Sequence, residues 1–240
     1  MEVNIAFAST GYGPYWAPAV SSWLRCVAYT SRHFQTNMLG KLGMAGVTDR
    51  MYTHSAENRL VEQFLEDKSL THLFMTECDM VLPHDAIVKL AEMDKALASG
   101  IYFLRSDSRE GVGQPCLYKR PAATDPLASE YGHCAVSLFP TDRPFKVNCA
   151  GLGCLLIKRE VFETLKYPWF DLKEKGYGSD IYFSKHAAEA GFDVWANPEV
   201  MCGQVDYYEM TVNDWKWQLE TNPKFAKFGF IIGADHAETT

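Results

Sequence analysis

The chain has 240 residues, of which 47% are hydrophobic and 22% charged, which allows one sizeable core and argues against bulk disorder. Its net charge is −7 and no run of Lys or Arg forms an obvious nucleic-acid footprint. No apolar stretch approaches the roughly 18 residues that a spanning helix needs, and acidic Glu2 stands where a signal peptide is basic. The seven scattered cysteines contain no CxxC pair, which is typical of free thiols in a reducing cytosol. We therefore expect a cytoplasmic protein without a transmembrane segment.

The first half of the chain alternates between apolar runs and amphipathic segments. Residues 3–8 form an apolar run, and residues 18–29 and 55–67 carry apolar side chains at helical spacing. Ser55 can cap the second of these helices, and Arg59 lies outside its apolar stripe. The other elements expected here are a strand at 70–75, a helix at 83–98 and a strand at 99–103.

The second half resumes this alternation after a long aperiodic stretch. Residues 106–137 are rich in Gly, Pro, Asp and Ser, which predicts a functional loop or lid. A helix at 180–190 has Gly191 just beyond its C-cap. Further elements are expected as strands at 145–148, 150–157 and 192–197 and a helix at 158–165. The alternation predicts an α/β fold with a mostly parallel central sheet covered by helices on both faces.

The C-terminal tail differs from the rest of the chain in its aromatic content. It contains Trp215, Trp217, Phe225, Phe228 and Phe230. We expect residues 1–208 to form the α/β domain. We expect residues 209–240 to form an extension that packs on this domain or on a partner in a homo-oligomer.

Two carboxylates, Glu77 and Asp79, follow the apolar run at 70–75. The carboxyl end of a strand is where open α/β sheets bind their ligands, and residues two apart on extended backbone point the same way. Two hard oxygen ligands suit Mg²⁺ or Mn²⁺ carrying a substrate phosphate. A solvated acidic turn is the alternative interpretation.

Three blocks of sequence, in this order, resemble the GT-A-fold glycosyltransferases of the small bacterial and phage family 2-like kind. The blocks are residues 57–62 with 71–80, residues 149–162, and residues 178–183 with 190–198. Together they span roughly residues 3–208. The ordered set is specific for fold and general chemistry, but not for the sugar or the acceptor.

The resemblance implies transfer of a sugar from a nucleotide-diphosphate sugar to a hydroxyl acceptor, assisted by Mn²⁺ or Mg²⁺. The acceptor could be a glycan, a lipid, a protein or a modified nucleic acid. Glu77, Cys78 and Asp79 stand in place of the family's DxD signature, so that Asp79 would bind the cation and Glu77 the ribose or a metal-bound water. Asp180 holds the second position of the family's Glu-Asp motif and would be the general base of an inverting reaction. Further donor contacts are implied at Thr10, Gly11, Arg59, Gly151 and Gly153.

The chain also departs from the family pattern and leaves alternatives open. Ser179 replaces the motif's Glu, and Gln204 stands where members have a metal-binding His, with Asp206 as a possible substitute. From spacing alone, Asp180 can also be interpreted as a helix N-cap with no other role. Residues 151–153 can also be interpreted as a tight strand–loop junction. Other functions considered are a nucleotidyltransferase, a sugar transferase acting on modified DNA bases, and a degenerate module that binds nucleotide sugar or glycan without turnover.

Overall fold

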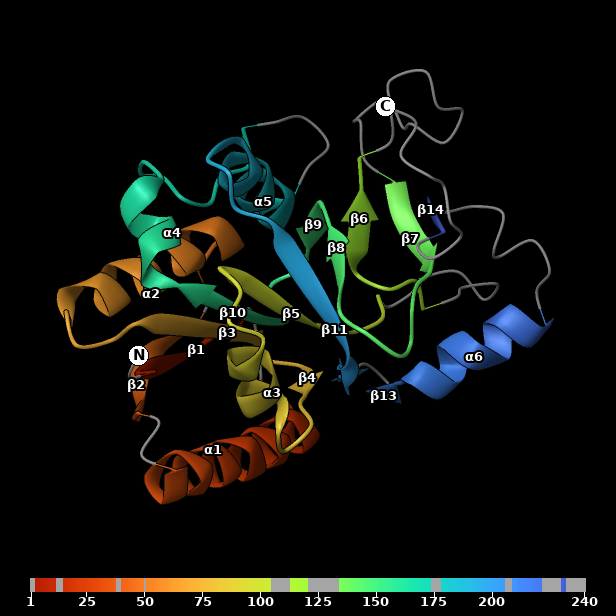
Figure 1. Ribbon diagram of the computed structural model, residues 1–240, viewed down its shortest axis with the longest axis horizontal. Helices are drawn as coiled ribbons and strands as arrows, with labels where there is room; N and C mark the ends of the chain where they lie inside the picture. The colour runs from red at the N-terminus through yellow and green to blue at the C-terminus, as the bar shows by residue number, and fades with distance from the viewer. Residues whose placement is uncertain are drawn as a thin grey trace.

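The computed structural model describes residues 3–11, 15–37, 40–49, 51–104, 113–120, 134–173, 178–205, 209–221 and 230–231. Its main feature is a seven-stranded sheet (Figure 1). The strand order across this sheet is β2 (Leu42–Asp49), β1 (Ile5–Gly11), β3 (His72–Glu77), β10 (Cys154–Lys158), β5 (Leu97–Ile101), β11 (Val194–Met201) and β8 (Phe145–Val147). All strands except β10 and β8 run in one direction, which confirms the predicted mostly parallel α/β sheet.

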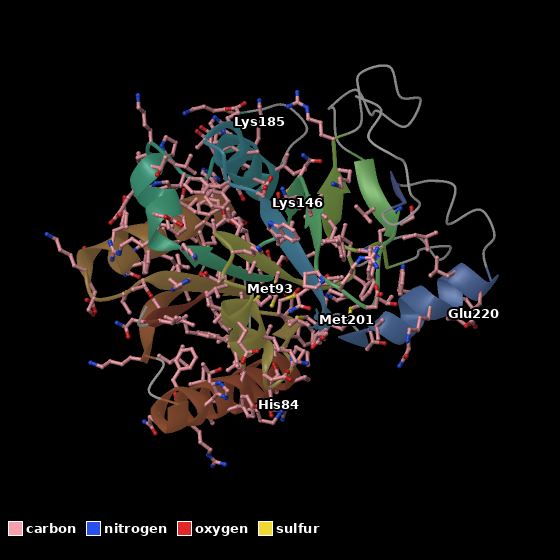
Figure 2. The ribbon with its side chains drawn as sticks, in the orientation of Figure 1. His84, Met93, Lys146, Lys185, Met201 and Glu220 are labelled. Atoms are coloured by element: carbon pink, nitrogen blue, oxygen red, sulfur yellow. The ribbon has the colours of Figure 1, made fainter. Side chains whose placement is uncertain are left out.

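Helices cover both faces of this sheet (Figure 1). One face carries α1 (Ala17–Asn37) and α3 (Ala86–Glu92), and the other carries α2 (Thr53–Glu66), α4 (Arg159–Thr164) and α5 (Ser179–Glu189). Side chains alternate along β1, so Ile5 and Phe7 pack in the cluster under α1 while Ala6 packs in the cluster under α2. His84 lies on the α1 side of the sheet (Figure 2). It packs edge-on against Tyr29, with ring centroids 4.7 Å apart.

Two smaller sheets flank the central one. The first has the order β13 (Glu209–Met210), β12 (Gly203–Val205), β4 (Met80–Val81). The second has the order β14 (Phe230–Ile231), β7 (Cys134–Leu138), β6 (Leu117–Lys119), β9 (Cys149–Ala150).

The last described helix is α6 (Val212–Thr221). Its Trp215 is buried, stacks on Phe139 at 4.6 Å between ring centroids, and donates from Nε1 to the Ser137 carbonyl. The proposed boundary at residue 208 stays a prediction, and residues 222–229 and 232–240 lie outside the described residues. In the part of the chain that the structure describes, no helix is long and apolar enough to cross a membrane.

Several sequence predictions of individual elements are wrong. The helix expected at 83–98 is only α3, and β5 begins at Leu97. Strands β6 and β7 occupy part of the stretch predicted to be an aperiodic loop, while residues 105–112 and 121–133 are outside the described residues. Strand β2 was not expected at all.

The helix ends correct one prediction, exclude one alternative interpretation and confirm another prediction. Helix α2 has Tyr52 at its N-cap position, without a side-chain cap, so the prediction that Ser55 caps it is wrong. Helix α5 has Gly178 as its N-cap, which excludes the N-cap interpretation of Asp180. At the other end of α5, Gly191 has a φ of +91° and Phe192 donates back to the Ala187 carbonyl at 2.9 Å, which confirms the predicted glycine C-cap.

Candidate active site

The two predicted metal-binding carboxylates lie at the carboxyl end of β3, next to the end of β1, where Thr10 pairs with Glu77. Cys78 and Asp79 form a turn between β3 and β4, so the assumption of continuous extended backbone is wrong here. Even so, Glu77, Cys78 and Asp79 line one cavity of about 210 Å³, together with Thr10 and Gly11. We call this the Asp79 cavity. The structure thus brings five of the predicted site residues together.

Backbone hydrogen bonds fix the shape of this turn. The Cys78 amide donates to the Thr10 carbonyl at 2.9 Å, and the Val205 amide donates to the Asp79 carbonyl at 2.8 Å. A Cβ on Gly11 would lie 2.8 Å from the Cβ of Cys78. Only glycine therefore allows β1 to approach the turn this closely.

Gln204 lies beside Asp79. It sits on β12, which pairs with β4, and its Nε2 donates to Oδ2 of Asp79 at 3.2 Å. Both side chains are buried, and Oε1 of Gln204 has no hydrogen-bond partner among the described residues. A buried carboxylate next to an unsatisfied amide oxygen offers two hard oxygen ligands, which fits Mg²⁺ or Mn²⁺.

This donor set does not form a metal site by itself. Within the described ranges, no group of three or more His, Cys, Asp or Glu side chains could hold a metal ion. Asp206 lies outside the described residues. A cation at Asp79 and Gln204 would therefore need further oxygen ligands from a bound phosphate or from water.

A second cavity, of about 320 Å³, adjoins the first and shares Glu77 and Thr53 with it. We call it the Asp180 cavity. Asp180 is the second residue of α5, and its Oδ1 accepts from the Ile181 amide at 2.8 Å. Burial raises the pKa of Asp180, against the effect of the amide donors. The carboxylate is thus a stronger base than an exposed Asp.

Glu57 is a residue of the Asp180 cavity that the sequence analysis did not identify as functional. It lies on α2, is 1% exposed, and accepts a hydrogen bond from the Ser179 side chain. Burial raises the pKa of Glu57 to about 8, and the nearby charges of Glu77 and Asp180 act in the same direction. Its position in the second turn of an amphipathic helix gives no sequence signal that separates it from a solvated carboxylate.

Arg59 lies at a third cavity, of about 480 Å³, rather than beside Asp79. Arg59 is exposed there, and the lining includes His54, which also lines the Asp180 cavity, and Met51, which also lines the Asp79 cavity. The three cavities therefore meet around the N-terminal turn of α2. The predicted contact of Arg59 with a nucleotide stays a prediction.

Gly151 and Gly153 have a packing role within the protein. A Cβ on Gly151 would collide with the hydroxyl of Tyr102, and one on Gly153 would lie 2.6 Å from Sδ of Met80. This supports the interpretation of a tight junction, and Leu152 between them lines the Asp180 cavity. Their predicted contact with a donor sugar stays a prediction.

Comparison with known proteins identifies the fold. No protein-family model and no curated protein matches the sequence. The structure is similar to the crystal structure of A197 from STIV, with 17% identity, 85% of this chain and 86% of that chain covered, and a TM-score of 0.54. It is also similar to GalNAc-T7, solved with UDP, GalNAc and Mn²⁺, with 12% identity, a TM-score of 0.52, and 90% of this chain but only 47% of that chain covered.

The fold is GT-A-like. At these identities the likeness shows the fold alone, so membership of the family 2-like group stays a prediction. The chain spans about half the length of the GalNAc-T7 chain that it matches.

Proposed function

We propose that this protein is a glycosyltransferase that moves a sugar from a nucleoside-diphosphate sugar to a hydroxyl acceptor. The observation that carries this proposal is the position of Glu77 between two cavities. On one side lies an oxygen-rich cavity with Asp79, and on the other lies a basic carboxylate, Asp180. The presence of UDP and Mn²⁺ in the similar GalNAc-T7 structure supports this assignment.

The Asp79 cavity would bind the nucleoside diphosphate. Asp79 and Gln204 would hold a divalent cation together with diphosphate oxygens, since Mg²⁺ and Mn²⁺ favour carboxylate, carbonyl and phosphate ligands. When bound, the cation neutralises charge that develops on the leaving diphosphate. Thr10 and Gly11, at the end of β1, would flank the nucleoside.

Asp180 would act as the general base. Its carboxylate takes the proton from the acceptor hydroxyl as that oxygen forms a bond to the anomeric carbon. The bond from that carbon to the diphosphate oxygen breaks, and its electron pair leaves with the nucleoside diphosphate. Attack on the face opposite the leaving group inverts the anomeric configuration. The raised pKa of Asp180 favours this proton transfer.

The test is release of nucleoside diphosphate from a panel of nucleotide sugars with MnCl₂. We expect at least one donor to be hydrolysed, and Asp180→Asn to lower its rate by about 100-fold or more with little change in the KM for the donor. Asp142→Asn, an exposed surface change, is the matched control. A protein that binds nucleoside diphosphates but releases none from any nucleotide sugar would be a binding module instead. The anomeric configuration of a transferred product decides between inversion and retention.

A further inference from the structure

Glu57 is buried in the Asp180 cavity without the full set of hydrogen bonds that a buried carboxyl needs. Its side chain is 1% exposed, and Oε2 has no partner among the described residues. An unsatisfied buried polar atom is costly, so its presence in a cavity wall points to a ligand that completes its hydrogen bonding.

Ser179 connects Glu57 to the proposed base. Ser179 stands directly before Asp180, and its hydroxyl donates to the Glu57 carboxyl. The Glu57 carboxyl, which projects from α2, thus lies next to Ser179, the residue before Asp180. Glu57 can therefore bind an acceptor hydroxyl close to the carboxylate that deprotonates it.

The charges of the cavity restrict the kind of acceptor. Three carboxyl side chains, those of Glu57, Glu77 and Asp180, line it, and no Lys or Arg does so in the described ranges. A phosphate or carboxylate group on the acceptor would be repelled by Glu77 and Asp180, and the described lining offers no Lys or Arg to pair with it. Hydroxyl groups, in contrast, can donate to carboxylates and accept from a protonated carboxyl.

The cavity also has an apolar part, beside the polar side chains of Thr53, His54 and Ser179. Tyr52 is 79% exposed and Leu172 is 51% exposed, and both line the cavity together with buried Leu152. The volume of about 320 Å³ lies within the range of small-molecule sites. A pyranose ring combines hydroxyl groups with apolar C–H faces, and this combination matches the lining.

We propose that the Asp180 cavity is an acceptor site for an uncharged sugar, in which Glu57 binds an acceptor hydroxyl and positions it for Asp180. This inference rests on the proposed function and adds the class of acceptor and a positioning residue. Glu57 would then be retained for binding rather than for the stability of the fold.

This role predicts opposite effects on binding and stability. Glu57→Leu replaces an unsatisfied carboxyl with an apolar side chain of similar size, so its Tm should equal or exceed that of the wild type. Its KM for the acceptor should rise about tenfold or more through the lost hydrogen bond, with the KM for the donor within about twofold. Glu57→Gln keeps a donor and an acceptor and should stay within about threefold of the wild-type KM for the acceptor.

The experiment measures transfer to methyl β-D-pyranosides of glucose, galactose, mannose and N-acetylglucosamine, with the nucleotide sugar that the wild type hydrolyses fastest. Glu66→Leu, an exposed change on the same helix, is the control and should leave the kinetics unchanged. Methyl β-D-glucuronide is compared with methyl β-D-glucopyranoside, because the two differ mainly in one carboxylate. We expect transfer to at least one uncharged glycoside and weaker transfer to the glucuronide.

Several results would overturn the inference. The first two are the absence of transfer to any of the pyranosides and a preference for the glucuronide. The others are an unchanged acceptor KM in Glu57→Leu and unfolding of that variant, because unfolding would show that the fold depends on the carboxyl. Failure of the proposed function is distinguished by a separate measurement. In that case, the wild type would release nucleoside diphosphate from none of the nucleotide sugars, whatever acceptor is present.

Discussion

Asn58 fixes the helix that carries Glu57 to the segment after α4, and its removal should be strongly destabilising. Its Oδ1 accepts from the amides of Trp169 and Phe170 at 3.0 and 3.2 Å, and its Nδ2 donates to the Phe170 carbonyl at 2.7 Å. The Asn58 side chain is 6% exposed, and Trp169 and Phe170 are also buried. Three buried backbone groups therefore depend on one side chain.

The size of the effect follows from those three groups. Asn58→Ala leaves each without its partner, and a buried unsatisfied group costs at least about 1 kcal/mol, so the free energy of unfolding should fall by about 3 kcal/mol or more. For a chain of this size, that loss lowers Tm by about 6–12 °C.

Urea unfolding followed by circular dichroism measures this change. Asn4→Ala is the matched control, because the Asn4 side chain also makes two backbone contacts, to Ser69 and Lys41, but at exposed positions. The control should lose about 1 kcal/mol or less. A loss below about 1 kcal/mol for Asn58→Ala, or an equal loss in both variants, would refute the reasoning.

Three further predictions concern stability. Burial lowers the pKa of His72 to about 4 from the ordinary 6.5, so between these pH values the unfolded chain binds a proton that the folded chain does not. The free energy of unfolding should therefore fall by about 3 kcal/mol as pH drops from 6.5 to 4, and urea midpoints measured across this range should fall less steeply in His72→Leu. Arg159 donates to the carbonyls of Asp67, Leu70 and Phe64 at 2.6, 2.7 and 3.1 Å, so Arg159→Ala should lower the free energy of unfolding by about 2–3 kcal/mol. Arg159→Lys should recover little of this loss because an ammonium lacks the planar fork of a guanidinium, and equal thermal stability of Arg159→Lys and the wild type would contradict this. Trp215→Ala removes a buried ring stacked on Phe139 and should lower the free energy of unfolding by about 3–5 kcal/mol. A Tm unchanged from the wild type would show that α6 is not part of the cooperative fold.

The sequence predicted the parts of the fold that have strong local signals. The run before Glu77 contains Leu73, Phe74 and Met75, and it forms the interior strand β3. Gly191 ends α5 because only glycine accepts its left-handed backbone without strain. Strand β2, in contrast, contains two glycines and few large apolar residues, and its pairing with β1 depends on tertiary contacts.

The candidate site was predictable where neighbouring strands bring residues together. Thr10 and Glu77 are paired across β1 and β3, so both lie at one end of the sheet. Glu57 could not be found in this way, because its burial results from packing between α2 and the start of α5. Arg59 lies two positions further along the same helix but lines a separate cavity, since helical residues two apart face nearly opposite directions.

The central claim is that the Asp79 cavity binds a nucleoside diphosphate together with a divalent cation. Thermal unfolding with UDP, GDP, CDP or ADP, each with and without MnCl₂, tests it most directly. Saturation at about 100 times Kd should add about 2.7 kcal/mol to the free energy of unfolding, or roughly 5–10 °C in Tm, for at least one nucleotide and only with the cation. Asp79→Ala should abolish this rise, and Asp142→Ala, at an exposed site, should retain it. An equal rise in wild type and Asp79→Ala, or no rise with any nucleotide, would contradict the account.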